Sequence, residues 1–162
     1  MGCSTDLRID IRRVNFAALL DSETTSRPVL VVDDDPNDVF LLQRALARWG
    51  IKAPVQIVKS GRECIDYLTC QGPFDDRRLY PVPVLVLLDL KMPGMDGCDV
   101  LKWIREQPQF EKLCVVLLTS TQGMDKCSDA QRVGATAILV KPMDYSKATE
   151  LQESIQRLLA SC

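Results

Sequence analysis

Five short apolar runs recur along the chain, and they constrain its fold more than any other feature of the sequence. They read VLVV at 29–32, VQIV at 55–58, VLVLL at 84–88, CVVLL at 114–118 and AILV at 137–140. Their apolar character is largely continuous rather than alternating, which is typical of strands covered on both faces. The runs therefore predict a parallel sheet of five strands.

Helical patterns separate these runs. After the first run, Asp35 and Pro36 suit an N-cap and a first helical residue, and Gly50 suits the end of the helix. The other intervals have helical patterns of varying strength, which begin near Gly61, Gly97, Gln122 and Ala148. Of these, the pattern between Gln122 and Val133 is the weakest. Five β-α units in tandem predict an α/β fold with a doubly wound sheet and helices on both faces.

Charge and composition exclude several classes of function. With 20 Lys and Arg against 22 acidic residues, the net charge of -2 gives no general attraction to nucleic acid or to an anionic membrane. The longest apolar runs fall far below the ~18 residues that a membrane span requires. No apolar stretch follows the first residues, and no closely spaced cysteine pair occurs, so we expect a cytoplasmic protein with reduced thiols.

The chain contains no histidine. Histidine-based catalytic triads, histidine-bound zinc and histidine general bases are therefore excluded together. Any chemistry must depend on carboxylates, lysine and hydroxyl groups.

Candidate side chains of these types follow the first, third, fourth and fifth apolar runs. Asp33 and Asp34 follow the first run, Asp89 the third, Thr119 the fourth and Lys141 the fifth. Because the carboxyl ends of parallel strands share one rim of a doubly wound sheet, these side chains should meet there. Each one alone is more commonly a turn residue, a strand hydroxyl or a solvated charge. Their joint position on one rim is what such structural roles leave unexplained.

The acidic part of this cluster predicts a metal site. Carboxylates held ~4 Å apart repel each other by about 4 kcal/mol at an effective dielectric near 20, so they need a cation or raised pKa values. Mg²⁺ is suitable because it uses one or two carboxylates, keeps several waters and also binds phosphate oxygens. A carboxylate can also attack phosphorus, and the transfer then needs mainly alignment and charge neutralisation. Mg²⁺, Lys141 and Thr119 could provide both.

At this point the chain resembles a known family, the response-regulator receiver domains. The motifs VLVVDDDPND, LLDLKMPGMDG, LLTS and VKP occur in the order and spacing of that family, and the resemblance covers about Pro28 to Leu159. It implies a flavodoxin-like strand order of 2-1-3-4-5. It also divides the chain into an N-terminal extension at 1–27 and a receiver domain at 28–162.

The resemblance assigns a role to each candidate site residue. Asp89 would accept the phosphoryl group. Asp34 and Asp89 would bind Mg²⁺ directly, Asp33 would bind it through water, and the backbone carbonyl of Lys91 would complete the protein ligands. The residues that would contact the phosphoryl oxygens are Thr119 and Lys141.

The resemblance also implies a regulatory protein rather than an enzyme. Its phosphoryl donor would be a sensor histidine kinase or a phosphotransfer protein. Its output would be contact with a downstream protein, or formation of a homodimer, with no nucleic acid or membrane as partner. The chain most resembles the single-domain regulators found beside phytochrome-type kinases. Lys91 and Thr121 occupy the two positions that flank the attacking water in this family, so we expect slow dephosphorylation.

One residue departs from the family pattern. Ile138 stands three residues before Lys141, where many receivers have an aromatic residue, so the usual readout of phosphorylation cannot be carried over. The family pattern also implies a cis peptide bond before Pro142. The long segment 71–83 should lie on the rim opposite the site, and either partner recognition or a tolerated surface insertion would explain it.

Other functions fit the sequence less well. A flavodoxin-type protein needs a phosphate-cradling loop after its first strand, where three aspartates would repel the phosphate. An aspartate-nucleophile phosphatase would carry a second aspartate where this chain has Lys91. A receiver-like scaffold that acts without phosphorylation does not explain the intact acidic set. A transcription factor is not expected, because no helix-turn-helix segment follows the receiver pattern.

Overall fold

The computed structural model describes residues 27–120, 131–142, 144–145 and 148–161. Its centre is a parallel sheet of five strands in the order β2-β1-β3-β4-β5, which confirms the predicted order. The strands are β1 (Val29–Val32), β2 (Val55–Val58), β3 (Leu85–Asp89), β4 (Cys114–Thr119) and β5 (Ala137–Val140). The third strand therefore lies one residue later than its apolar run suggested.

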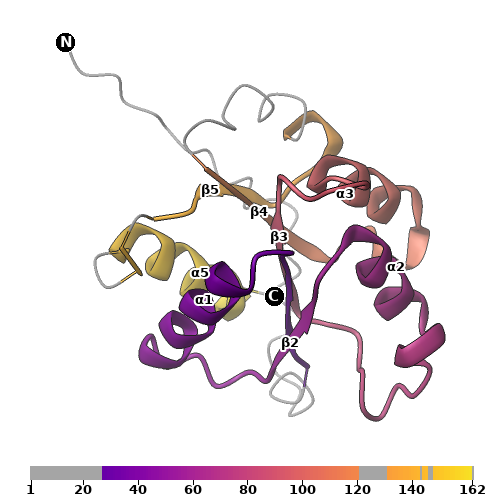
Figure 1. Ribbon diagram of the computed structural model, residues 1–162, viewed down its shortest axis with the longest axis horizontal. Coiled ribbons are helices and arrows are strands. Elements are labelled where there is room, and N and C mark those ends of the chain that lie inside the picture. The colour runs from indigo at the N-terminus through magenta and orange to yellow at the C-terminus, as the bar shows by residue number, and fades with distance from the viewer. Residues whose placement is uncertain (1–26, 121–130, 143, 146–147, 162) are drawn as a thin grey trace.

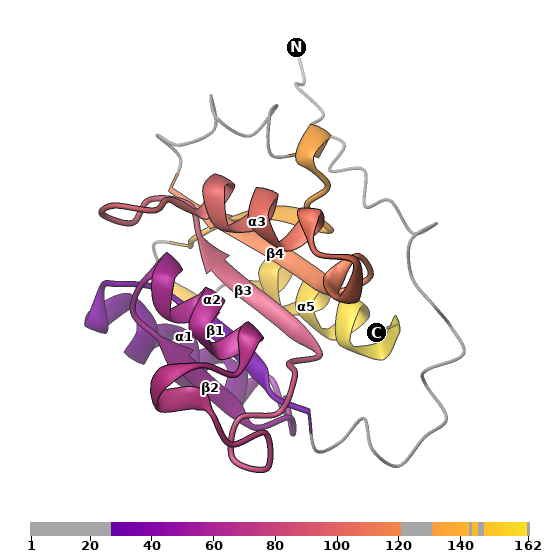
Figure 2. The ribbon, with the colours of Figure 1, turned by 90° about the vertical axis from the view of Figure 1, so that its right-hand side faces the viewer.

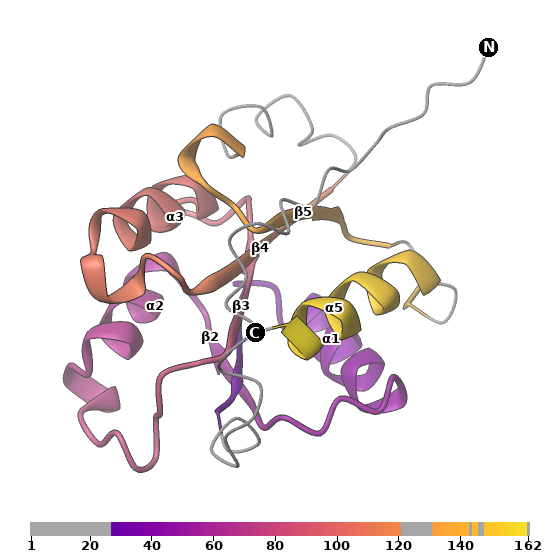
Figure 3. The same cartoon turned by 180° about the vertical axis from the view of Figure 1, so that it is seen from behind.

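Helices cover both faces of this sheet, as the sequence predicted. Figure 1 shows α1 and α5 on one side and α2 and α3 on the other, and the view from behind in Figure 3 gives the same division. The α-helices are α1 (Pro36–Arg48), α2 (Gly61–Thr69), α3 (Gly97–Glu106) and α5 (Thr149–Ser161). Two short 3₁₀ turns are η3 (Gly72–Phe74) and η4 (Pro108–Phe110).

The two layers of helices explain why the strands are apolar throughout. In β1, Leu30 and Val32 pack into the core formed with α2 and α3, whereas Val29 and Val31 pack into the core formed with α1 and α5. All four side chains have no exposed surface. Alternate residues of a strand point to opposite faces, and here both faces of the sheet are covered by helices and buried.

The helix termini near the carboxyl rim of the sheet are fixed by their own side chains. Asp35 is the N-cap of α1 and accepts a hydrogen bond from the backbone N–H of Asn37, as the sequence indicated. At α3, Asp96 and Asp99 form a reciprocal capping box. These caps hold both helices just beyond the ends of β1 and β3, where the candidate site residues lie.

The start of α3 packs directly against the backbone of β3. The N–H of Gly97 donates to the carbonyl of Leu90 at 3.0 Å. A Cβ atom on Gly97 would lie 2.4 Å from the carbonyl oxygen of Asp89 and 2.9 Å from the Cα of Leu90. Only glycine permits this approach without a shift of the backbone.

The segment 71–83 enters β3 from the rim opposite the carboxyl ends of the strands, as predicted. Arg77 ties this segment to α2 by donating to the carbonyls of Tyr67, Leu68 and Tyr80. The rings of Tyr67, Phe74 and Tyr80 pack against one another with centroids 5.2 to 5.9 Å apart. The segment is thus an organised part of the domain, and the choice between partner recognition and a plain insertion stays open.

Some predictions fall outside the described residues. They include the N-terminal extension up to residue 26, most of the helix expected between Gln122 and Val133, and the role of Thr121. Within the described residues, no helix has the length and apolar character needed to cross a bilayer.

One expectation about the cysteines is wrong. Cys64 and Cys70 are free thiols, as expected. Cys114, at the start of β4, is disulfide-bonded. The expectation rested on sequence spacing, whereas a disulfide requires only that two sulfurs meet in space, however far apart they are in the chain.

The guanidinium contacts of Arg77 lead to a stability prediction. Replacing Arg77 with Met leaves three backbone carbonyls without this donor, so we expect the free energy of unfolding to fall by about 1–3 kcal/mol. Urea unfolding followed by circular dichroism measures the change. The control is Arg78→Met, because Arg78 is a highly exposed residue that pairs with Asp76 on the surface. This variant should leave the midpoint near that of the wild type. Equal midpoints for the two variants would contradict the structural role of Arg77.

Gly97 leads to a second stability prediction, whose sign is unusual. An exchange of glycine for alanine at a compatible site normally stabilises a protein by about 0.4–1 kcal/mol. Here the added methyl group collides with the backbone of β3, so Gly97→Ala should destabilise by about 1–3 kcal/mol, the usual cost of overpacking. Lys102→Ala, on the exposed face of the same helix, is the control and should change stability by less than about 0.5 kcal/mol. A stabilised Gly97→Ala variant would contradict the close approach.

Candidate functional site

The predicted site residues meet on one rim because of the register of the strands. Asp33 and Asp89 lie side by side, since the residues just before them are paired across β1 and β3. Thr119, the last residue of β4, lies one step beyond the residue that pairs with Asp89. Lys141 directly follows the residue of β5 that pairs with Thr119. Figure 2 shows the central strands running in one direction toward this rim.

Three of the predicted metal ligands converge closely. Carboxylate oxygens of Asp33, Asp34 and Asp89 all lie within 4.8 Å of one another. Asp33 and Asp89 are buried, whereas Asp34 is exposed. The cluster therefore has two fixed acidic groups on its inner side and one that faces solvent.

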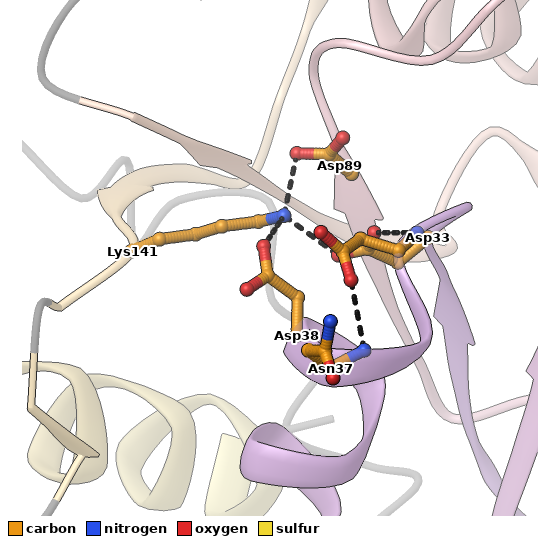
Figure 4. A network of polar contacts seen from close by, with 6 residues as sticks. Asp33, Asn37, Asp38, Asp89 and Lys141 are labelled. Carbon is orange, nitrogen blue, oxygen red and sulfur yellow. Dashed lines mark hydrogen bonds and ion pairs between the residues drawn. The ribbon is translucent and has the colours of Figure 1, made fainter.

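Lys141 is the cation that balances this cluster in the structure. Its Nζ atom lies 2.6 Å from Oδ2 of Asp33, 2.8 Å from Oδ2 of Asp38 and 2.9 Å from Oδ1 of Asp89. Figure 4 shows the side chain reaching across from the end of β5 into the space between these carboxylates. The three contacts come from three separate elements, so the ammonium joins β1, α1 and β3 to β5.

The electrostatic environment changes the protonation behaviour of this network. Burial raises the pKa of the Asp89 carboxyl above its ordinary value, and the charges of Asp33 and Asp34 act in the same direction. The hydrogen bond and charge of Lys141 oppose them and favour the ionised carboxylate. Burial alone would lower the pKa of Lys141, but its three carboxylate partners outweigh that effect and hold the pKa above its ordinary value.

Thr119 and Lys91 lie beside the ion-pair network. Thr119 is buried at the end of β4, and its hydroxyl donates to the carbonyl of Ser120 at 2.9 Å. Lys91 lies in the loop that follows β3, with an exposed side chain. The structure thus brings four predicted residues into direct proximity, namely Asp33, Asp34, Asp89 and Lys141. Thr119 ends the neighbouring strand on the same rim.

Two residues near the site were missed by the sequence analysis. Asp38 lies in the first turn of α1 and pairs with Lys141. The sequence did contain a signal for it, because an acidic residue in the first turn of a helix that starts on this rim can point back to the sheet. The buried hydroxyl of Tyr145 has no hydrogen-bond partner among the described residues, and burial raises its pKa to about 12. Nothing in the sequence indicated that position.

Two details of the family pattern can be compared with the structure. No cis peptide bond occurs among the described residues, so the expected cis bond before Pro142 is not present. The trans form is the intrinsically preferred one, and Lys141 reaches all three carboxylates with it. Ile138 is 6% exposed and packs in the core formed with α2 and α3.

The donor set fits a hard divalent cation. Carboxylate oxygens are the ligands that Mg²⁺ and similar ions prefer, and Mg²⁺ retains several of its waters. The exposed carboxylate of Asp34 leaves one side of the cluster open to solvent. Among the described residues this acidic group is therefore a candidate metal site.

Comparison with known proteins identifies relatives of similar sequence. The chain is 31% identical over 130 residues to the two-component response regulator ARR7 of Arabidopsis thaliana, which covers 80% of this chain and 62% of ARR7. It is 26% identical over 136 residues to the response regulator Rcp1 of Synechocystis, which covers 84% of this chain and 90% of Rcp1. The chain thus spans less than two thirds of ARR7 and most of Rcp1.

Solved structures give the same result. The phosphorylated cyanobacterial phytochrome response regulator RcpA superposes with a TM-score of 0.73 at 26% identity, over 84% of this chain and 95% of that one. The Mn²⁺-bound form of Rcp1 superposes with a TM-score of 0.70 at 27% identity, over 80% and 91% of the two chains. The family model of the response regulator receiver domain matches residues 29–156. The chain therefore belongs to the response regulator receiver domain family of two-component signalling.

Proposed function

We propose that this protein receives a phosphoryl group on Asp89 in a Mg²⁺-dependent reaction and passes the signal on by protein contact. The observation that carries the proposal is the convergence of the carboxylates of Asp33, Asp34 and Asp89 within 4.8 Å, next to the Lys141 ammonium. A structural ion pair needs one carboxylate for one lysine. Three carboxylates and one partly buried lysine form a site with an excess of negative charge, which suits a divalent cation.

In this proposal Asp89 is the nucleophile. Its carboxylate oxygen forms the new O–P bond while the P–N bond to a phosphohistidine of the donor breaks, and the imidazole leaves with the electron pair. The nucleophile must be ionised, and the hydrogen bond from Lys141 favours that form. Its position at the end of a buried strand fixes its direction of attack.

Lys141 and Thr119 would contact the transferred group. The Lys141 ammonium already lies 2.9 Å from Asp89 and can donate to a phosphoryl oxygen after small rotations of its long side chain. The Thr119 hydroxyl, which now donates to the carbonyl of Ser120, can donate to a phosphoryl oxygen instead. Both are donors that stabilise charge on the oxygens during transfer.

The metal would be held by the acidic cluster. Asp34 and Asp89 are the proposed direct ligands, with Asp33 acting through water and the backbone carbonyl of Lys91 completing the set. When bound, Mg²⁺ would neutralise the acidic cluster and the phosphoryl oxygens. The Mn²⁺-bound form of Rcp1, a relative by sequence and fold, supports a divalent cation here.

The proposal extends to partners and organisation. The similarity to phytochrome response regulators supports a sensor histidine kinase, or a phosphotransfer protein, as donor. On this view the protein is a cytoplasmic regulator rather than an enzyme, with residues 28–162 as the receiver domain and 1–27 as an extension. Its downstream partner would be a protein, or a second copy of this chain in a homodimer.

The proposed phosphoacceptor has a direct test. The wild type, incubated with acetyl phosphate and MgCl₂, should gain one phosphoryl group by intact mass, and EDTA should prevent this gain. The label should be removed by hydroxylamine, which cleaves an acyl phosphate but not a phosphoserine or phosphothreonine. Asp89→Asn should abolish the labelling, because an amide is a poor nucleophile toward phosphorus.

Asp75→Asn is the control, since Asp75 is an exposed aspartate in the segment on the opposite rim. It should be labelled like the wild type. Undiminished labelling of Asp89→Asn would contradict the assignment. Absence of labelling in the wild type, with any donor, would favour a receiver-like scaffold that acts without phosphorylation.

A further inference from the structure

The ammonium of Lys141 uses its whole hydrogen-bonding capacity within the site. It carries three N–H groups and no acceptor. Three carboxylates, those of Asp33, Asp38 and Asp89, lie 2.6 to 2.9 Å from its nitrogen. One N–H group is therefore available for each carboxylate, and none remains for another partner.

These three partners are not equivalent. Asp33 and Asp89 belong to the candidate metal cluster, whereas Asp38 does not. Asp38 also differs in position, because it lies in α1 and its side chain is 37% exposed, against 3% for Asp33 and 9% for Asp89. It is thus an acceptor for Lys141 on the solvent side of the site.

This difference matters as soon as the acidic cluster takes up a cation. Lys141 and a divalent cation compete for the negative charge of Asp33 and Asp89, because both are positive and both are drawn to these two carboxylates. The Lys141 side chain is only 14% exposed, so its ammonium depends mainly on protein acceptors rather than on bulk water. Without another acceptor, its release from Asp33 and Asp89 would leave a largely buried charge without a partner, which is costly.

We propose that Asp38 is a positioning residue that holds Lys141 at the edge of the site while the metal cluster is occupied. This inference rests on the proposed function and concerns the regulation of the same site. By retaining one strong charge-assisted hydrogen bond, Asp38 lets Lys141 release Asp33 and Asp89 without leaving the rim. The residue therefore promotes cation binding although it does not contact the cation.

A purely structural role for Asp38 predicts a different result. An acidic side chain in the first turn of a helix is favourable on its own, through the helix dipole. That role would affect the stability of α1 and would not depend on Lys141. It can therefore be separated from the proposed role by removing Lys141.

The experiment measures the Kd for Mg²⁺ by isothermal titration calorimetry, without any phosphoryl donor. Asp38→Asn removes the charge and should raise this Kd about tenfold. Asp38→Glu keeps a carboxylate and should restore most of the affinity. The matched control is Asp35→Asn, because Asp35 lies on the same rim but accepts from the backbone of Asn37 rather than from Lys141. Since asparagine is an equally good N-cap, this variant should change the Kd less than twofold.

A second comparison isolates the part played by Lys141. In a Lys141→Met background, adding Asp38→Asn should change the Kd less than twofold, because no ammonium remains to be held. A tenfold effect that persists in this background would mean that Asp38 acts only by its charge, and the inference would be wrong. Equal effects of Asp38→Asn and Asp35→Asn would overturn it too.

Failure of the inference can be told apart from failure of the proposed function. If the wild type neither binds Mg²⁺ nor accepts phosphate from acetyl phosphate, the proposed function itself is wrong. If the wild type does both, and Asp38→Asn matches Asp35→Asn, only the role of Asp38 is wrong. Circular dichroism of every variant establishes that each is folded before its Kd is compared.

Discussion

The acidic cluster at the carboxyl ends of the strands depends on the positive charge of Lys141. Carboxylates ~4 Å apart repel each other by about 4 kcal/mol at an effective dielectric near 20, and the cluster of Asp33, Asp34 and Asp89 falls within that range of separation. Lys141 balances part of this repulsion, and it can do so only because β5 pairs with β4. The backbone N–H of Lys141 donates to the carbonyl of Thr119 at 2.7 Å, which continues the ladder between these strands beyond the end of β5. The sheet order is therefore a requirement of the site as well as of the core.

Charged side chains have different roles on the two rims of the sheet. On the rim with the amino ends of the strands, arginine side chains donate to loop carbonyls and fix the connections. Arg27 holds the carbonyls of Val82 and Pro83, and Arg77 holds the end of α2. On the other rim, carboxylates gather around the ammonium of Lys141. Arginine side chains thus fix the backbone on one rim, whereas the opposite rim keeps an excess of negative charge that suits a cation.

The sequence was sufficient for the elements whose signal is local. The apolar runs placed the strands to within a residue, and Asp35 with Pro36 placed the start of α1, because burial and capping act on neighbouring residues. The proximity of Asp33, Asp89 and Lys141 could also be predicted, because it requires only that the carboxyl ends of parallel strands lie on the same rim of the sheet. The contact of Asp38 with Lys141 was not predictable in the same way, because it depends on the rotation of α1 about its axis. The packing of segment 71–83 depends on contacts among the rings of Tyr67, Phe74 and Tyr80 across an irregular loop, where no regular period indicates which rings meet.

The replacement of an aromatic residue by Ile138 changes how a signal can leave the site. Ile138 is 6% exposed and packed in the core on the side of α2 and α3, so it has no solvent-exposed position from which to swing inward. The backbone offers another connection, since Thr119 and Lys141 are joined across β4 and β5 by a hydrogen bond of 2.7 Å. Under the proposed function both residues turn toward the same phosphoryl group, so a displacement of one strand end is carried to the other. Packed cores respond to such displacements by shifts of whole elements rather than by local compression. Under the proposed function, the end of β5 is therefore one place where a change at Asp89 would reach the surface, at the exposed side chain of Val140.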